Sequence, residues 1–416
     1  MTVRYQVVIC GAGPVGMAAA LMLIRRGIDP TQIALIDARS LGQAISDPRS
    51  IAVSYGSRLL LEEIGAWPAA ATTAIEQIHI SRRGHFGRTL IDRAEQQVPA
   101  LGYVTRYGEL VNALAIACER AGLVTLRPLK VSVCDEHADH VSLTLDDGSV
   151  LQAALVVQAE GGLFGEQQTR ARQHDYDQSA VIARVATSAP IAHRAYERFT
   201  DEGPLALLPQ YELGADRSGM DGSIGSIPSS FPYGEHEDAR VRRNTSADAN
   251  ALQYALVWCV RPERAQALLA LDDAAFLTQL GEAFGSRLGR FTQCSARMSY
   301  KLGLNAEPRA TARTVAIGNA AQTLHPVAGQ GLNLGLRDAA VLGRLLAHEV
   351  TPAQLAKFAG ARAIDRQLTI GLTDAMARAF AQAGPLQALL GLSLGALDAV
   401  APARSLLADL MMYGRR

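Results

Sequence analysis

A glycine-rich segment near the N-terminus has the spacing of a nucleotide-binding turn. Gly11, Gly13 and Gly16 form a G-x-G-x-x-G pattern directly after an apolar run, and a helix of small residues follows. The first glycine permits a tight turn, the second lets the backbone approach a pyrophosphate, and the third lets the helix pack on the strand. The start of the helix adds N–H groups and partial positive charge, so we expect phosphates to bind here.

Asp37 narrows the type of nucleotide. It lies at the end of a second apolar run, residues 33–36, where a carboxylate can accept hydrogen bonds from a ribose 2′-hydroxyl. The same carboxylate would repel a 2′-phosphate. The N-terminal segment therefore favours FAD or NAD over NADP.

A second glycine-rich segment, residues 315–338, decides between these two. An apolar strand at Val315 leads into three glycines within seven positions, Gly329, Gly331 and Gly335, and then into a helix. Such a backbone can lie against a flat ring, and the helix N-terminus can face the electron-rich edge of a reduced flavin. An NAD dehydrogenase has no need of this element, so the two segments together predict FAD.

Four further motifs are typical of one enzyme family. They are residues 47–52 (DPRSIA), 198–206 (RFTDEGPLA), 256–259 (LVWC) and, most specific, 318–326 (GNAAQTLHP). With them the chain resembles the FAD-dependent aromatic hydroxylases related to p-hydroxybenzoate hydroxylase, in the ubiquinone-biosynthesis branch. The resemblance covers nearly the whole chain except residues 211–250, a polar excursion without apolar periodicity.

The resemblance implies an α/β fold, α+β overall. It consists of a Rossmann-like FAD-binding domain of the glutathione reductase type, an inserted sheet-rich substrate domain and C-terminal helices. We expect the FAD-binding domain at residues 1–75, 100–178 and 295–345. The substrate domain is expected at 76–99 and 179–294, with a flexible excursion at 211–250, and the C-terminal helical region at 346–416.

The resemblance also implies a reaction. Reduced FAD would react with O₂ to give a C4a-hydroperoxyflavin, which hydroxylates the ring of a polyprenylated phenol, and NADPH or NADH would supply the electrons. Two alternatives stay open: a non-catalytic FAD-binding assembly subunit, and a flavoprotein prenyl reductase. Expected partners are the phenol, O₂, a membrane surface, other quinone-biosynthesis proteins and a second copy of the chain.

Several site residues follow from the family's pattern. Asn319 stands where the family has an aspartate on the flavin ribityl chain, and its amide can still bond a hydroxyl. Glu160 likewise replaces an aspartate after a buried strand. Arg49 is expected near the pyrophosphate and the nicotinamide nucleotide, with a surface ion pair as the alternative, and Arg106 as a flavin-facing contact. The remaining expected flavin contacts are Gly329, Gln330, Gly331, Leu332 and Asn333.

His325 and Pro326 are the candidate catalytic residues, although the chemistry belongs mainly to the flavin. His325 can bond a substrate oxygen or, alternatively, the neighbouring backbone. The sequence contains no H-x-x-x-H or His/Cys cluster, so no metal site is expected. It also lacks the G-x-S-x-G elbow of serine hydrolases.

The elements that position these residues can be predicted from local pattern. A βαβ unit occupies residues 5–37, and helices are expected at 49–64, at 108–121 and through most of 336–416. Residues 141–145 and 150–155 flank Asp146-Asp147-Gly148, which indicates a hairpin. Short apolar runs between residues 181 and 260 predict a second sheet.

Composition limits location and partners. The 416 residues include 40 basic and 40 acidic side chains, so no net charge favours nucleic acid. Five scattered cysteines indicate a reducing compartment, hence the cytoplasm, and the N-terminus leaves no room for a signal peptide. Five leucines at helical spacing fit either a surface at the inner face of the membrane or a protein interface: Leu386, Leu389, Leu390, Leu394 and Leu397.

Overall fold

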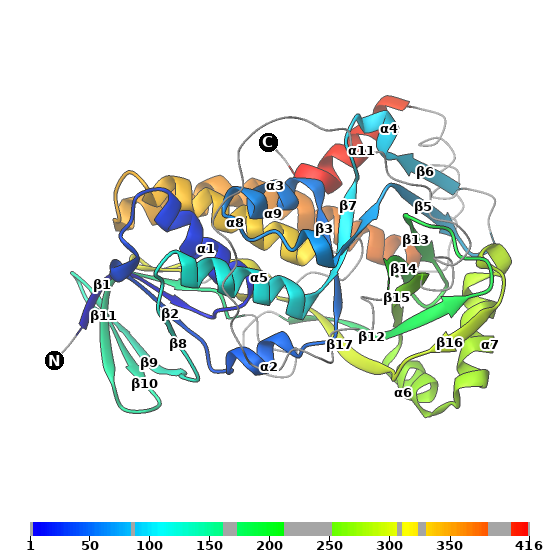
Figure 1. Ribbon diagram of the computed structural model, residues 1–416, viewed down its shortest axis with the longest axis horizontal. Coiled ribbons are helices and arrows are strands. Elements are labelled where there is room, and N and C mark those ends of the chain that lie inside the picture. The colour runs from blue at the N-terminus through cyan, green and yellow to red at the C-terminus, as the bar shows by residue number, and fades with distance from the viewer. Residues whose placement is uncertain are drawn as a thin grey trace, which may run out of the picture.

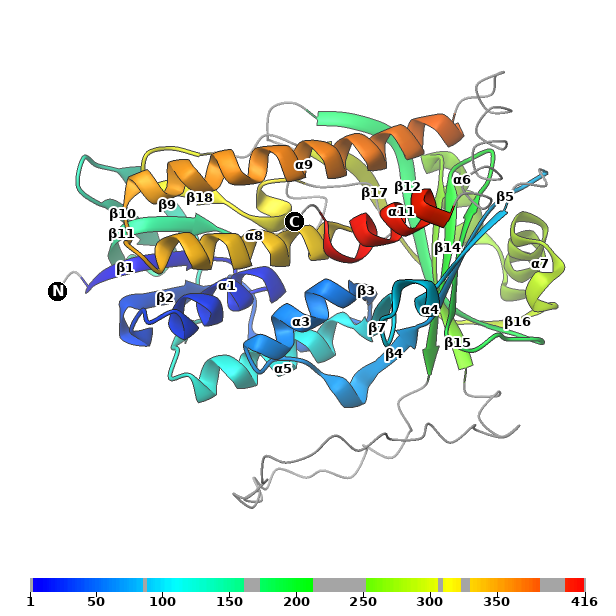
Figure 2. The same cartoon turned by 90° about the horizontal axis from the view of Figure 1, so that it is seen from above.

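Two large β-sheets and a layer of helices make up the protein. The computed structural model describes residues 3–84, 88–160, 173–211, 252–305, 310–322, 330–381 and 401–414. The first sheet lies at the N-terminal end of the elongated molecule and the second at the opposite end (Figure 1). Helices run along the length between them, and the last one, α11 (Ala401–Tyr413), lies beside the second sheet (Figure 2).

The first sheet contains the predicted βαβ unit. Its order is β8-β2-β1-β11-β10-β9, with β18 beside β11. β1 pairs in parallel with β2 and β11, and β10 forms the predicted antiparallel hairpin with β11. The strands are β1 (Val3–Cys10), β2 (Ile33–Ile36), β8 (Thr125–Leu126), β9 (Val131–Glu136), β10 (Val141–Leu145), β11 (Val150–Gln158) and β18 (Thr314–Ala316).

Apolar helix faces cover this sheet. The helices are α1 (Pro14–Arg25), α5 (Tyr107–Arg120), α8 (Gln330–Leu346) and α9 (Pro352–Ala381). The main core gathers fully buried side chains from α1, α5, α8 and the strands, including Leu23, Leu114 and Leu342. Burial of this many aliphatic groups is the main stabilising term, about 1.5–3 kcal/mol for each fully buried side chain.

The second sheet has the order β16-β12-β15-β14-β13-β5-β6, with β17 beside β12. One face packs on α6 (Pro262–Ala270) and α7 (Asp273–Phe284) around Trp258, Tyr196 and Phe276. The strands are β5 (Gln77–Arg82), β6 (Arg88–Asp92), β12 (Gln173–Thr187), β13 (Arg194–Phe199), β14 (Pro204–Tyr211), β15 (Leu252–Val260), β16 (Phe291–Cys294) and β17 (Met298–Asn305).

A three-stranded sheet, β3-β7-β4, joins the two regions. It consists of β3 (Ser50–Ser54), β7 (Gly102–Arg106) and β4 (Thr72–Ile75), and α2 (Leu41–Ile45) and α4 (Arg93–Gln96) lie nearby in the chain. The prediction of a helix from residue 49 is wrong for its first part, because β3 pairs with β7 over five residues. The helix α3 (Tyr55–Glu63) begins only after Ser54, whose side chain caps it.

Some predicted features lie outside the described residues. They are nearly all of the polar excursion, since residues 212–250 of the predicted 211–250 are not described, and the five spaced leucines between 386 and 397. Within the described part, residues 330–381 and 401–414 are mainly helical, as predicted. None of the described helices is both long and apolar enough to cross a membrane.

Candidate cofactor site

The two glycine-rich segments meet at Val15. A Cβ on Gly335 would lie 2.6 Å from Val15 Cγ2, and one on Gly318 would lie 3.2 Å from Val15 Cγ1. Within the first segment, a Cβ on Gly16 would lie 1.9 Å from the carbonyl oxygen of Gly11. Glycine is therefore required where α1 packs on its own turn and where α8 packs on α1.

The first segment leaves a helix N-terminus open. Gly11 turns with φ +104°, and its N–H donates to the carbonyl of Ile36 at 2.7 Å. Gly13 is the N-cap of α1, and no side chain caps this helix. The first-turn N–H groups are thus available to an anion, as a pyrophosphate requires.

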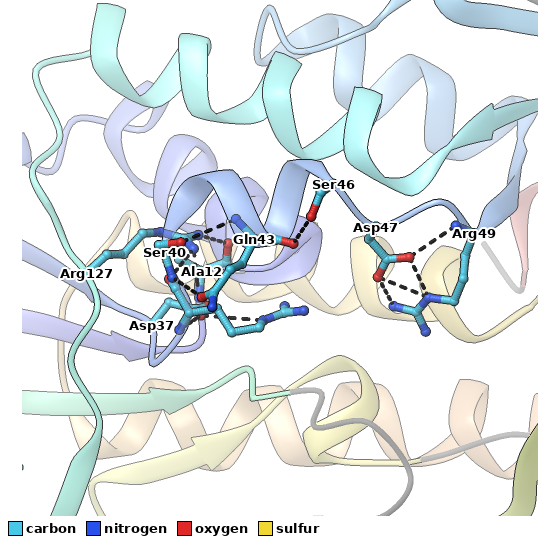
Figure 3. Close-up of polar contacts among 9 residues, drawn as sticks. Ala12, Asp37, Ser40, Gln43, Ser46, Asp47, Arg49 and Arg127 are labelled. Atoms are coloured by element: carbon cyan, nitrogen blue, oxygen red, sulfur yellow. Dashed lines mark hydrogen bonds and ion pairs between the residues drawn. The ribbon is translucent and has the colours of Figure 1, made fainter.

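Asp37 is held in place by backbone and by a buried arginine (Figure 3). Its two oxygens accept from the N–H groups of Ala12 and Arg39, each at 2.8 Å. Arg127 Nη1 lies 3.7 Å from the carboxylate, and its guanidinium also donates to the carbonyls of Ala12 and Arg39. Burial lowers the pKa of Arg127, and the charge of Asp37 opposes that shift.

Arg49 is engaged by Asp47, two residues earlier (Figure 3). Its Nη2 lies 2.6 Å from Asp47 Oδ2, and its Nε also donates to that carboxylate. The guanidinium stacks over the rings of Tyr107 and Tyr300, at 5.0 and 6.0 Å from their centroids. Burial on its own would lower the pKa of Arg49, but the hydrogen bonds and charge of Asp47 raise it overall. Arg106 precedes Tyr107 and lies opposite Ser50 in the β3–β7 pair.

The second segment exposes Asn319 and buries its neighbours. Asn319 follows Gly318, which has φ +58°, and its Oδ1 would lie 3.6 Å from a Cβ on Gly331. Gly331 and Leu332 keep accessible surface at the start of α8. Two residues expected at the flavin have structural bonds instead. Asn333 bonds the backbone of Ser54 and Ala52 in β3, and Gln330 donates to the carbonyl of Met411.

The carboxylate of Asp338 holds the second glycine-rich segment in place. The carboxylate is fully buried and accepts from the N–H of Gly318 at 3.1 Å and from Gln322 at 3.3 Å. Arg362 and Arg366 of α9 donate to it at 2.6 and 3.1 Å. Four donors satisfy this buried carboxylate, so the turn at Gly318 is fixed by a helix more than twenty residues away.

Glu160 lies two residues after the end of β11 and is exposed. Its backbone N would lie 2.7 Å from a Cβ on Gly11, so it stands beside the first glycine turn. The candidate catalytic residues His325 and Pro326, together with Gly329, lie outside the described residues.

Comparison with known proteins places the chain in a family. The family model for an FAD binding domain matches residues 4–181 and 245–360. The ubiquinone hydroxylase UbiL of Rhodospirillum rubrum is 30% identical, covering 96% of this chain and 87% of that protein. The 3-demethoxyubiquinol 3-hydroxylase of Escherichia coli is 28% identical over 80% of this chain and 77% of its own length. The chain belongs to the FAD-binding monooxygenases of the ubiquinone-hydroxylase group.

A solved structure agrees on the fold of this monooxygenase. The p-nitrophenol 4-monooxygenase PnpA of Pseudomonas putida superposes with a TM-score of 0.70 over 100% of both chains at 17% identity. The predicted mixed α/β FAD-binding monooxygenase fold is therefore confirmed. The predictions of an FAD-dependent hydroxylase and of an FAD cofactor are confirmed with it, and the family uses NAD(P)H.

The residues of this monooxygenase fit an FAD. An uncapped helix N-terminus, a carboxylate at the end of β2 and the exposed amide of Asn319 provide groups for the pyrophosphate, a ribose and a polyol chain. Arg127 and Asp338 support these groups and were not predicted from the sequence. A clue to Asp338 existed, since it stands at helical spacing between Leu334 and Leu342, and a charge on the apolar face of a helix requires a partner.

Proposed function

We propose that this monooxygenase hydroxylates the aromatic ring of a polyprenylated phenol in ubiquinone biosynthesis. Its specific activity would be that of a 2-octaprenyl-6-methoxyphenol hydroxylase. The observation that carries the proposal is the 30% identity to a ubiquinone hydroxylase along 96% of the chain. The motif at residues 318–326, GNAAQTLHP, supports the same branch.

We assign the cofactor contacts to both segments. Gly11, Gly13, Gly16 and Asp37 would hold the dinucleotide end, and Asn319 would bond the ribityl chain. Gly329 to Asn333 would place their backbone beside the flavin ring, because the side chains of Asn333 and Gln330 form hydrogen bonds with β3 and α11. When bound, reduced flavin activates O₂ for insertion into an electron-rich ring; the protein orients that ring and excludes water.

The reductant site is the second part of the proposal. Arg49 lies between two tyrosine rings and keeps a guanidinium at the edge of the cofactor site, where a phosphate could share it with Asp47. Arg106 and Glu160 would contact the flavin from the ends of β7 and β11. His325 and Pro326 are proposed to lie against the substrate.

Location and assembly also remain proposals. A polyprenylated phenol is nearly insoluble in water, so we propose that the protein works in the cytoplasm against the inner face of the membrane. The leucines between 386 and 397 would provide the contact. The domain division 1–75, 100–178 and 295–345 against 76–99 and 179–294 is proposed on the same family pattern, as are a homo-oligomer and quinone-biosynthesis partners.

An assay with purified, FAD-loaded protein tests the function. We expect a prenylated methoxyphenol to stimulate NAD(P)H oxidation, and ¹⁸O₂ to label the hydroxylated product. The O-methyl ether of the same phenol serves as the matched control, because a ring without a free hydroxyl is less electron-rich at the attacked carbon. A saturated product without ¹⁸O would indicate a reductase, and FAD binding without stimulated oxidation would indicate a subunit without turnover.

Deletion of the gene tests the pathway. We expect cells without the protein to accumulate an unhydroxylated polyprenylphenol, measured by mass spectrometry of lipid extracts. Normal ubiquinone content in the deletion strain would contradict the assignment to ubiquinone biosynthesis, even if the purified enzyme were active on a phenol.

A further inference from the structure

Glu197 is the one acidic residue on β13, and it belongs to a transverse row across the second sheet. The backbone register places Ile182 beside Val257, Val257 beside Ala206, and Ala206 beside Glu197. These four side chains point to the face opposite α6 and α7, because side chains alternate along each strand. We call Ile182, Val257, Ala206 and Glu197 the Glu197 row.

This row keeps accessible surface between covered neighbours. All four of its members are partly exposed. On one side the next row is closed, with Phe199, Cys259 and Ala180 at 0%, 1% and 5% exposure. On the other side Ala195 and Ala255 are also buried. Buried positions thus border the strip, although Leu208 and Arg184, on either side of Ala255, also keep accessible surface.

The elements above the row connect it with the cofactor site. Phe199 packs with Leu101 and with Met412 of α11, while Gln330, the first residue of α8, donates to the carbonyl of Met411. Ser50 of β3 donates to Gln210 of β14, on the same face of the sheet as Ala206. The strip thus lies under the junction of β3, α11 and the start of α8, where the second flavin segment continues.

Glu197 is the polar end of an apolar strip. Burial raises the pKa of its carboxyl to about 8, while the side chain keeps some accessible surface. Within the described part of the chain it makes no hydrogen bond or ion pair. A desolvated carboxyl without a protein partner is destabilising unless a ligand or water supplies the missing bond. Its accessible surface leaves room for that ligand.

Given the proposed function, we infer that Glu197 binds the ring hydroxyl of the phenol substrate, and that Ala206, Val257 and Ile182 form the surface along which its apolar ring and tail lie. Strands are about 4.8 Å apart, so the row spans about 14 Å, enough for the ring and the first isoprene units. The small side chain of Ala206 leaves space for a flat ring next to the carboxyl. A carboxylic acid can accept from the phenol and donate to an adjacent ether oxygen.

Ligand binding to the FAD-loaded protein tests this inference. Dissociation constants are measured by flavin absorbance for a short-chain prenylated phenol and for its O-methyl ether. We expect wild type to prefer the phenol by about tenfold or more, the value of one well-formed hydrogen bond. E197L should lose that preference, and E197Q, which has the same shape and retains a donor and an acceptor, should keep most of it.

Controls separate the inference from folding and from the proposed function. Glu202→Gln alters a partly exposed carboxylate in the turn between β13 and β14, outside the Glu197 row and paired with Arg264, and this variant should bind both ligands like wild type. If E197L does not fold, A206L tests the strip, because the larger side chain should lower the affinity for the phenol and for its methyl ether by the same factor. Wild-type binding without preference, or an undiminished preference in E197L, overturns the inference while leaving the function intact. Absence of phenol-stimulated NAD(P)H oxidation in wild type overturns the function itself.

Discussion

Asp338 and Glu197 are both carboxyl groups in packed parts of the molecule, but Asp338 is fully buried among donors whereas Glu197 keeps some accessible surface. Asp338, between α8 and α9, accepts from two backbone or amide groups and from two arginines. Glu197, on the second sheet, has no such donors among the residues that the structure describes, and burial raises its pKa to about 8. A carboxylate with every bond made holds a backbone turn rigidly, whereas a carboxyl without a protein partner is ready for a ligand.

The same contrast applies to the cofactor region as a whole. Asp37 bonds two N–H groups and faces Arg127, so the first segment is as well supported as the second. The cofactor half of the molecule is therefore preorganised before any ligand arrives. On the second sheet, by contrast, Glu197 makes no hydrogen bond to the described residues and lies at the end of an apolar strip.

The largest effect is expected from Asp338→Ala. Removing the carboxylate takes away the counter-ion that buried Arg366 shares with Arg362, which keeps its pair with Asp365, and frees the turn at Gly318. The free energy of unfolding should therefore fall by about 3–5 kcal/mol. Urea unfolding and retained FAD measure this. Glu62→Gln, which breaks only the exposed pair with Arg58, should cost less than about 0.5 kcal/mol. If the two variants lost the same free energy of unfolding, Asp338 would be no more important for stability than an exposed ion pair.

Glu197→Gln should raise the free energy of unfolding, and the size of this increase should depend on pH. Because the folded-state pKa of Glu197 is raised above its ordinary value of 4.5 to about 8, the folded state retains a proton that the unfolded state releases. Titration of Glu197 therefore does not lower the free energy of unfolding below about pH 4.5. Between about pH 4.5 and pH 8 it lowers that free energy by at most about 1.4 kcal/mol per pH unit, and above about pH 8 the loss is constant.

The difference between wild type and E197Q isolates this group, since all other titrations are shared. We expect E197Q to equal wild type near pH 4.5 and to be the more stable protein at pH 8, by urea unfolding at both values. A difference that does not change with pH would show that Glu197 has an ordinary pKa.

Gly335→Ala should have an intermediate effect by separating the two glycine segments. Its Cβ would lie 2.6 Å from Val15, a contact that must move, at a cost of about 1–3 kcal/mol. We expect a lower affinity for FAD, measured by equilibrium dialysis. Gly360→Ala, on α9 with no atom within 4 Å of the new Cβ, should be neutral or slightly stabilising and retain FAD.

The smallest change in stability is expected from Asp47→Asn, below about 1 kcal/mol, because the pair with Arg49 is partly exposed. Its effect should lie in nucleotide binding. If Arg49 contacts the reductant, freeing it from Asp47 lowers the KM for NAD(P)H, whereas Arg49→Gln raises it. Unchanged KM values in both variants would assign Arg49 to a purely structural ion pair.

The sequence alone determined what depends on short-range geometry. The βαβ unit, the glycine turn, the position of Asp37 and the β10–β11 hairpin all follow from residues close together in the chain, where local sterics and hydrogen bonding select one conformation. The cofactor and the enzyme class followed from the pairing of two glycine-rich motifs and their resemblance to a family.

Only the tertiary structure decided features whose partners are distant in sequence. Residues 50–54 have helical neighbours but form β3, because β7 provides a ladder fifty residues away. Three further features depend on which elements pack together. They are the pairing of Asp338 with α9, the burial of Arg127 against Asp37, and the position of Glu197 among apolar neighbours. Hydrophobic burial selects that packing for the whole chain, and a local pattern cannot specify which charge will meet which partner.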